Sequence, residues 1–293
     1  MTVKLSYLLN IFGAGAVPNI LMDLIPHLEG YQISILSLQE IDRENDYMVE
    51  KCLARGIQLE SLGLKRKEIL RSYRALKKYL QEKQPDIIHS HLGRADILSA
   101  FVRPEDSILI TTFHNVRENY QKLIRAMYYL TDNMVDYRVS VSHAVQNSWY
   151  GKWHLKSRNR VIYNPVSFER VESPGDLSSI KSEFGIKTGD KLLLSIGRLI
   201  KQKGHIYLIE SMEKIVQEDK SVKLIIAGTG HLKGSLEKEI IKRGLEDYIY
   251  LAGFRSDIPE LLELADLFVF PSLWEGLGLA VLEAMIARVP VVA

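Results

Sequence analysis

Short runs of valine, isoleucine and leucine alternate along the chain with longer segments in which apolar residues recur every three or four positions. Runs bounded by turn residues are typical of strands, and the longer spacing is typical of amphipathic helices. Several runs are apolar throughout, as strands are when helices cover both faces of a parallel sheet. The predicted strands are Val3–Leu9, Gln32–Leu38, Asp86–His89, Ile108–Phe113, Arg138–Ser142, Arg160–Tyr163, Lys191–Ile196, Lys223–Ala227, Tyr248–Leu251, Leu267–Phe270 and Val289–Val292. This order predicts an α/β fold with right-handed crossovers between parallel strands.

The pattern breaks between the two series of strands, at residues 164–176 (NPVSFERVESPGD), where proline, glycine and serine gather. A chain of 293 residues is long enough for two domains, each with a core of its own. We therefore predict an N-terminal domain over residues 1–165 and a C-terminal domain over residues 166–293, each a Rossmann-like parallel sheet.

Composition excludes several classes of protein. With 46% hydrophobic and 25% charged residues, the chain has the balance of a globular protein and not of a disordered one. A net charge of only +2 gives no overall basic field for binding nucleic acid. The single cysteine, Cys52, cannot form an internal disulfide or a cysteine-based metal site, and it suits a reducing compartment. No stretch reaches the roughly 18 apolar residues of a membrane-spanning helix, so we expect a cytoplasmic protein.

The N-terminus partly imitates a secretory signal peptide, because Lys4 precedes an apolar run and an Ala-Gly-Ala triplet at 14–16. Apolar residues continue at helical spacing after the triplet, so a strand, a glycine turn and a helix fit better. The turn at 13–18 (GAGAVP) begins like a dinucleotide-binding fingerprint but carries Pro18 where the helix must pack closely. It favours an anion site at Gly15 over nicotinamide binding, the alternative being a plain tight turn.

Positive charge is concentrated in the first part of the chain. Up to Pro165 there are 22 basic and 17 acidic residues, a net of +5, and beyond it 16 basic and 19 acidic residues, a net of −3. The predicted helix Leu64–Lys83 holds eight of these lysines and arginines, with an apolar stripe along one face. A solvated helix packed on a sheet is the simpler interpretation. Contact with an anionic membrane surface is the alternative.

Three cations follow the strand Lys191–Ile196, in the loop 197–204 (GRLIKQKG) that leads into a helix. Ligands of open α/β sheets bind at the carboxyl ends of strands, where Arg198, Lys203 and helix N–H groups could hold a diphosphate. An exposed basic loop is the alternative. A further glycine-rich segment, 228–235 (GTGHLKGS), lacks the Gly-Lys-Ser order of a Walker A loop and is not an ATPase motif.

The most specific segment is 271–284 (PSLWEGLGLAVLEA), which follows a buried strand and begins a helix near Gly278. Glu275 lies in the loop and Glu283 in the second helical turn, with free backbone N–H groups between them. Two carboxylates on either side of such a turn can accept hydrogen bonds from vicinal hydroxyls while the turn holds a phosphate.

These segments resemble the retaining, group 1 (family four) glycosyltransferases, whose GT-B fold has two Rossmann-like domains facing each other across a cleft. Residues 275–283 resemble their Glu-x7-Glu motif, 197–204 their donor-diphosphate motif, and 224–230 (LIIAGTG) the next strand and glycine turn. In the first domain, 111–115 (TTFHN) resembles the strand-end histidine segment and 161–166 (VIYNPV) the segment before the hinge. The likeness is strong over residues 191–293 and looser before residue 165.

The resemblance implies transfer of a sugar, with retention, from a nucleotide-diphosphate sugar to a polysaccharide or lipid-linked acceptor. Arg198 and Lys203 would neutralise the diphosphate, Glu283 would hold the ribose hydroxyls, and Glu275 and His114 would contact the sugar. The residues whose backbone would approach the donor are Gly15, Gly197, Gly228, Gly276, Leu277 and Gly278. The family's Gly-Gly-Ala-Glu turn reads AGAV at 14–17, which weakens the assignment of Gly15, and its Asn-Gly reads NP at 164–165.

No metal or other cofactor is expected. The chain has no Asp-x-Asp, so Arg198 and Lys203 would have to stabilise the charge on the leaving diphosphate. By the resemblance, the leaving phosphate takes the proton of the acceptor, and His114 orients the sugar and is not an obligatory base. His89 and His91 could ligate a metal. However, we assign them to opposite faces of their strand, and this placement favours buried structural roles over a metal site.

Two other functions compete with the transferase. A nucleotide-sugar epimerase of the same fold would need no acceptor, and a partner protein would bind the nucleotide sugar without turning it over. The chain ends at 289–293 (VPVVA), within a strand pattern, where family members continue. We therefore expect an incomplete second domain and weak catalysis. The lipid-linked acceptors of many family members add weight to peripheral contact of Leu64–Lys83 with the inner face of a membrane.

Overall fold

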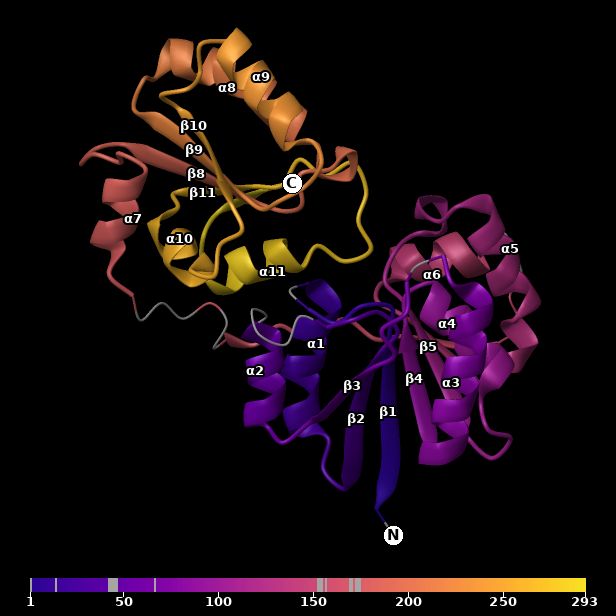
Figure 1. Cartoon of the computed structure of the whole chain (residues 1–293). Helices are drawn as coiled ribbons and strands as arrows, with labels where there is room; N and C mark the ends of the chain where they lie inside the picture. The colour runs from indigo at the N-terminus through magenta and orange to yellow at the C-terminus, as the bar shows by residue number, and fades with distance from the viewer. Residues whose placement is uncertain are drawn as a thin grey trace. The chain divides into compact units, whose positions relative to one another are not determined.

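The chain forms two compact units in the computed structural model, Met1–Pro165 and Val166–Ala293, and the division lies at the start of the proline- and glycine-rich segment 164–176. The structure describes residues 2–13, 15–41, 47–65, 67–151, 155, 157–168, 171 and 175–293. Part of segment 164–176, Ala14 of the GAGAVP turn and Arg66 of the basic segment lie outside the described residues. Both units are parallel-sheet α/β folds (Figure 1).

The first unit is a seven-stranded parallel sheet in the order β3-β2-β1-β4-β5-β6-β7. Its strands are β1 (Val3–Leu9), β2 (Tyr31–Ser37), β3 (Gln58–Ser61), β4 (Ile87–His91), β5 (Ile108–Phe113), β6 (Tyr137–Ser140) and β7 (Arg158–Val161). Its α-helices are α1 (Ala16–Leu24), α2 (Tyr47–Ala54), α3 (Ile69–Lys83), α4 (Arg94–Val102), α5 (Lys122–Leu130) and α6 (His143–Tyr150).

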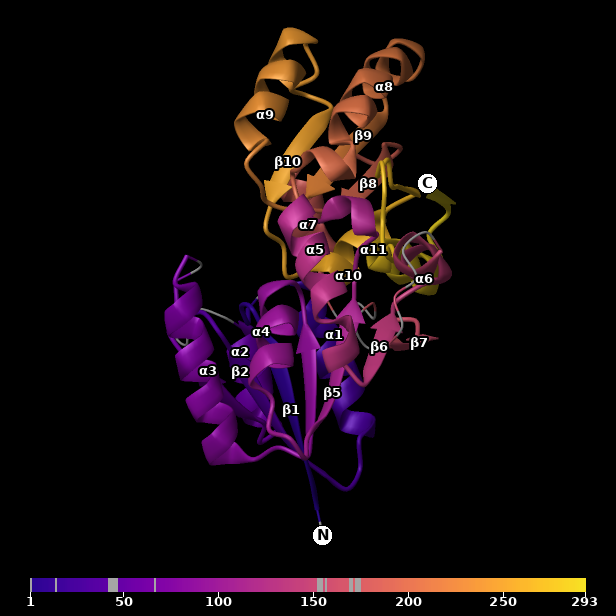
Figure 2. The same cartoon turned by 90° about the vertical axis from the view of Figure 1, so that its right-hand side faces the viewer.

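Alternation along the strands divides the core of this unit into two layers. On β1, Leu5 and Tyr7 pack with α1 and α2, whereas Leu8 points to the other face and packs with α3 and α4. Helices α3 and α4 lie side by side there (Figure 2). Since β1 and β4 are neighbours and the strand order reverses between them, the loops that follow these two strands flank the switch point of the sheet.

The second unit is a five-stranded parallel sheet in the order β10-β9-β8-β11-β12. Its strands are β8 (Lys191–Ile196), β9 (Val222–Ala227), β10 (Ile249–Gly253), β11 (Leu267–Val269) and β12 (Val291–Val292). Its α-helices are α7 (Leu177–Glu183), α8 (His205–Glu218), α9 (Lys233–Lys242), α10 (Ile258–Leu264) and α11 (Leu279–Ile286). Helices α8 and α9 cover one face, and α7, α10 and α11 cover the other (Figure 1).

The two-sheet α/β architecture predicted from the sequence is therefore confirmed, with differences in the bounds of several elements, among them β4, which runs to His91 and not to His89. Strand β3 was not predicted, because its four residues at the sheet edge include only one apolar side chain, Leu59. Helix α3 begins at Ile69 and not at Leu64, since Glu68 accepts a hydrogen bond from the backbone N–H of Lys65 at 2.8 Å in a turn before the helix. Strand β7 begins two residues earlier than expected, where Arg158 pairs with Tyr137.

Candidate functional site

Two loops meet at the switch point of the second sheet. Residues 197–204 follow β8 and residues 271–278 follow β11, and these strands are neighbours at the place where the strand order reverses. Such a point leaves a crevice at the carboxyl ends of the strands, which is where open α/β sheets bind ligands. The two loops therefore lie where proteins with this type of sheet bind their ligands.

Backbone contacts hold the two loops together. Gln202 is buried, and its Nε2 donates to the carbonyl oxygen of Trp274 at 2.9 Å, while Leu273 N–H donates to the carbonyl of Gln202 at 2.8 Å. Gly204 has a φ of +65°, and a Cβ there would overlap the carbonyl oxygen of Pro271. Only glycine allows both this backbone conformation and this approach.

Lys203 and Glu275, one from each loop, form an ion pair with Nζ and Oε1 2.7 Å apart. Both side chains are largely covered, being 16% and 22% exposed. The ammonium also lies 4.6 Å from the centre of the Phe270 ring, a cation–π distance. The aliphatic stem passes close to Gly197, where a Cβ would lie 3.1 Å from Cδ of Lys203. Both residues were predicted from the sequence to lie in the site, but their contact with each other was not.

A third loop, residues 228–230 after β9, packs against the backbone of the first. Gly228 has a φ of +145°, and a Cβ there would overlap the carbonyl oxygen of Gly197. Leu199 N–H donates to the carbonyl of Thr229 at 2.8 Å, which fixes the course of the chain beside Arg198. The side chain of Arg198 is exposed and unencumbered by this packing. The glycines thus allow the close packing of the loops, and the 197–204 loop presents the cations.

Helix α11 begins directly after the 271–278 loop. Gly278 is its N-cap, without a side-chain cap, and lies against the Phe270 ring. Glu283 lies in the second turn and is buried, at 7% exposure, whereas Glu275 and Leu277 are half-buried and Gly276 is buried. Glutamate is among the residues least often buried in folded proteins, so the burial of Glu283 sets it apart from the solvated acidic residues of the unit.

His205 is the first residue of helix α8, directly after the 197–204 loop. It is buried, and among the described residues its Nδ1 has no hydrogen-bond partner. Burial, and secondarily the charge of Lys203, lower the pKa of His205 to about 4. The imidazole is therefore neutral at pH 7. The sequence contained no signal for this residue beyond its place after Gly204.

In the first unit, the structure brings His114 together with His89 and His91. Residues two apart on a strand point to the same face, so the assignment of His89 and His91 to opposite faces is wrong. Their ring centres lie 4.4 Å apart, and His91 Nδ1 is 2.8 Å from His114 Nε2. No group of three histidine, cysteine, aspartate or glutamate side chains in the described part of the chain has an arrangement that would hold a metal ion.

Gly15 precedes α1 with extended backbone, and a Cβ there would meet nothing closer than 3.9 Å. Neither conformation nor packing requires glycine at this position. The functional assignment of Gly15 thus rests on the resemblance alone.

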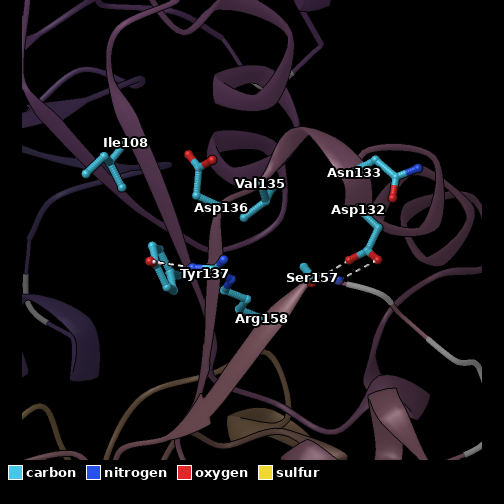
Figure 3. A pocket seen from close by; sticks show the side chains of 8 residues that line it. All are labelled: Ile108, Asp132, Asn133, Val135, Asp136, Tyr137, Ser157 and Arg158. Atoms are coloured by element: carbon cyan, nitrogen blue, oxygen red, sulfur yellow. Dashed lines mark hydrogen bonds between the residues drawn. The ribbon is translucent and has the colours of Figure 1, made fainter.

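A pocket of about 460 Å³ lies at the amino ends of strands β5, β6 and β7 of the first sheet (Figure 3). Its carboxylates already have partners: Asp132 accepts from Ser157 and Arg138, and Asp136 accepts from Arg103. No residue predicted from the sequence to bind a ligand lines it.

Within the described residues, no helix is both long and apolar enough to span a membrane.

Two domain families match the chain. Residues 178–293 match the family described as Glycosyl transferases group 1, and residues 27–170 match Glycosyltransferase Family 4. The chain is 30% identical over 222 residues to an uncharacterised glycosyltransferase of Methanocaldococcus jannaschii, covering 71% of this chain and 57% of that protein. It is 25% identical over 282 residues to the Escherichia coli enzyme UDP-Gal:alpha-D-GlcNAc-diphosphoundecaprenol alpha-1,3-galactosyltransferase, covering 92% of this chain and 72% of that one.

The fold matches solved structures as well. Anabaena HepE in complex with UDP and glucose superposes with a TM-score of 0.83 at 21% identity, over 99% of this chain and 80% of that one. WaaG, a glycosyltransferase involved in lipopolysaccharide biosynthesis, superposes with a TM-score of 0.72 at 16% identity, over 99% and 80%. The chain spans 34% and 57% of the lengths of the two Methanocaldococcus jannaschii relatives it matches. With both domain families present in order and the two-sheet GT-B architecture, the chain belongs to the group 1 glycosyltransferases.

Proposed function

We propose that this chain carries the donor-binding and sugar-contacting residues of a retaining glycosyltransferase, which uses a nucleotide-diphosphate sugar and a glycan or lipid-linked acceptor. The observation that carries the proposal is the pair of loops 197–204 and 271–278 at the switch point of the second sheet, with Lys203 and Glu275 in contact. The relative from Escherichia coli is named for a UDP-sugar donor and a diphosphoundecaprenol-linked acceptor, and HepE was solved with UDP-glucose.

Each residue then has a role that its chemistry permits. Arg198 and Lys203 neutralise the diphosphate, while the backbone at Gly197, Gly228 and Gly276–Gly278 allows its close approach. Glu283 accepts hydrogen bonds from the ribose hydroxyls, and Glu275 accepts from the hydroxyls of the sugar. The ammonium of Lys203 has three N–H donors, so it can keep Glu275 while binding a phosphate oxygen.

In the transfer step, the bond between the anomeric carbon and the diphosphate oxygen breaks while the acceptor oxygen bonds to that carbon from the same face. The acceptor proton passes to the departing diphosphate oxygen, so no side-chain nucleophile is needed. Negative charge grows on the diphosphate, where Arg198, Lys203 and the N-termini of α8 and α11 are favourably placed to stabilise it. His114 orients the sugar through a hydrogen bond.

The site assignment is tested by calorimetric titration of UDP-, GDP- and ADP-sugars. Arg198→Met and Glu283→Gln should each weaken binding of the accepted donor about tenfold to a hundredfold, as expected for loss of one charge-assisted hydrogen bond. Lys214→Met and Glu263→Gln, at exposed positions of the same unit, serve as matched controls and should bind normally. Normal binding by both site variants would contradict the assignment. Formation of an epimer without acceptor would favour the epimerase instead.

We also propose that turnover needs no divalent metal, because cations and helix N-termini of the chain itself face the predicted diphosphate position. EDTA should leave donor binding and transfer unchanged. Loss of transfer on chelation, restored by Mg²⁺ or Mn²⁺, would overturn this.

A third proposal is that the start of α3 contacts anionic membrane lipid. Ile69 and Leu70 are 65% and 63% exposed, and they project among the cations Lys67, Arg71 and Arg74. Glu68 lines the same surface and pairs with Arg71 at 3.1 Å, so the surface keeps an excess of positive charge. Exposed apolar side chains beside such an excess fit an interface of acyl chains and acidic headgroups.

Vesicle flotation tests this contact. The chain should float with phosphatidylglycerol-containing vesicles but not with neutral phosphatidylcholine vesicles, and the binding should fade as salt is raised. A double variant, Ile69→Ser with Leu70→Ser, should lose most of the binding. The control Ile241→Ser, which removes an equally exposed apolar side chain in the other unit, should keep it. Equal flotation with both kinds of vesicle would overturn the proposal.

A further inference from the structure

A row of aromatic rings crosses three strands on one face of the first sheet. Tyr7 of β1 pairs in register with His89 of β4, and their ring centres are 5.3 Å apart. His91 follows at 4.4 Å from His89, and His114, just after β5, follows at 5.1 Å from His91. The row ends at His114, which is half-buried, so the last ring is the one that a ligand can reach.

Hydrogen bonds fix the rings within this row. His89 Nε2 lies 2.7 Å from Thr112 Oγ1, and His91 Nδ1 lies 2.8 Å from His114 Nε2. The other nitrogen of His91, Nε2, is buried and has no hydrogen-bond partner among the described residues. His91 is itself 3% exposed, so water does not readily replace that partner.

All three imidazoles are neutral at pH 7. Burial lowers the pKa of His89 to about 4 and of His114 to about 3, and it also lowers the pKa of His91. The neighbouring imidazoles lower the values for His91 and His114 further, because charging one ring disfavours charging the next. A neutral imidazole carries one proton, so the bond between His91 and His114 can be made in two ways.

In the first arrangement, His114 donates from Nε2, and the proton of His91 must then sit on its buried Nε2 as an N–H without an acceptor. In the second, His91 donates from Nδ1 and its Nε2 is a bare acceptor. Buried backbone N–H groups without partners are rarer in proteins than under-satisfied carbonyl acceptors, and we apply the same preference to the His91 ring. The second arrangement is therefore favoured, and it places the proton of His114 on Nδ1.

We infer that His91 is a positioning residue that locks His114 in the Nδ1–H tautomer, so that His114 presents a hydrogen-bond donor at Nδ1. The contact with a sugar rests on the proposed function, but the tautomer does not. Without His91, His114 exchanges freely between a ring that donates from Nδ1 and one that accepts there.

The tautomer can be measured without any substrate. In long-range ¹H–¹⁵N correlation spectra of the ¹⁵N-histidine-labelled chain at pH 7, His114 should show a protonated Nδ1 and a bare Nε2, and His91 the same. His114 is assigned by the loss of its signals in His114→Gln. A protonated Nε2 on His114 in the unsubstituted chain would overturn the inference by itself.

Variants then test whether His91 is the cause. His91→Phe keeps a ring of similar shape and removes the donor, so His114 should shift to a mixture of tautomers. His91→Asn keeps an N–H near the place of Nδ1 and should restore the Nδ1–H form. His89→Phe serves as the matched control, because it changes a stacked ring without touching the bond to His114. An unshifted tautomer in folded His91→Phe would contradict the inference.

Activity adds an independent reading. If a donor and acceptor pair is found, His91→Phe should lower kcat roughly tenfold, the effect of one neutral hydrogen bond, with UDP affinity unchanged and with recovery in His91→Asn. Unchanged kcat beside a shifted tautomer would remove the functional part of the inference. If no transfer occurs with any pair, the proposed function fails, while the spectra still decide the tautomer.

Discussion

At the scale of single residues, burial of the histidines couples the stability of the first unit to pH. His89, with a pKa of about 4 when folded, regains the ordinary value near 6.5 when the chain unfolds. Between these values the unfolded chain binds the extra proton, so stability is full above pH 6.5 and falls as pH drops toward 4. Asp96 acts in the opposite direction, because burial raises its pKa to about 6.

We therefore predict that His89→Gln flattens the loss of stability between pH 6.5 and pH 4.5. One group contributes at most about 1.4 kcal/mol per pH unit, which sets the size of the change in slope. Urea denaturation at several pH values, followed by a probe in the first unit, measures it. The exposed His27→Gln provides the control and should keep the slope of the unsubstituted chain. An unaltered slope in His89→Gln would show that His89 titrates normally in the fold.

Lys203 supports a second prediction at this scale. Its Nζ lies 2.7 Å from Oε1 of Glu275 and over the ring of Phe270. Removing the charge of Lys203 therefore leaves the largely covered carboxylate of Glu275 without this cation. Lys203→Met should weaken nucleotide-sugar binding about tenfold or more, and adding Glu275→Gln should recover part of the lost stability without recovering the binding. A double-mutant cycle read by denaturation and by calorimetry separates these effects. Binding that returned with the second substitution would mean that Lys203 serves only to hold Glu275.

At the scale of elements, the loops of the second unit are set by glycines that accept no side chain. Gly204→Ala and Gly228→Ala would each place a Cβ against a carbonyl oxygen in a backbone conformation that alanine disfavours. Each should cost about 1–3 kcal/mol of stability and weaken nucleotide-sugar binding. Gly234→Ala is the contrast: Gly234 lies within α9 with open space around it, so alanine should stabilise the chain by about 0.5–1 kcal/mol. Thermal and chemical denaturation of the three variants decides between these signs.

The elements also show what could be predicted from the sequence. Buried strands such as β8 and β9 were placed correctly because both faces of these strands are covered, which forces an apolar run. Strand β3 escaped because an edge strand of mixed polarity has no such pattern, and its pairing with β2 decides its existence. The contact of Lys203 with Glu275 joins residues 72 positions apart, so only the strand order could reveal it. His91 was noticed, but its role depends on His114 of another element.

At the scale of the whole molecule, two units with separate cores should respond separately to a ligand. A nucleotide that binds the folded second unit stabilises it by about 2.7 kcal/mol at a hundredfold excess over Kd. Hydrogen exchange in the presence of UDP should therefore slow most in peptides from residues 192–289. Slowing that was greatest in residues 3–140 would place the nucleotide on the first sheet and contradict the donor assignment.

Cys52 is a natural probe for the opening of the first unit. It is the only cysteine, it is fully covered in the core of the first unit, and its Sγ lies 3.8 Å from Sδ of Met22 on α1. An alkylating reagent can reach this thiol only after the layer of α1 and α2 has lifted from the sheet. The rate of labelling thus counts openings of one unit and is blind to the other. Labelling with a maleimide, followed by mass spectrometry, would measure the rate at which the first unit opens, with no engineered probe and no substrate.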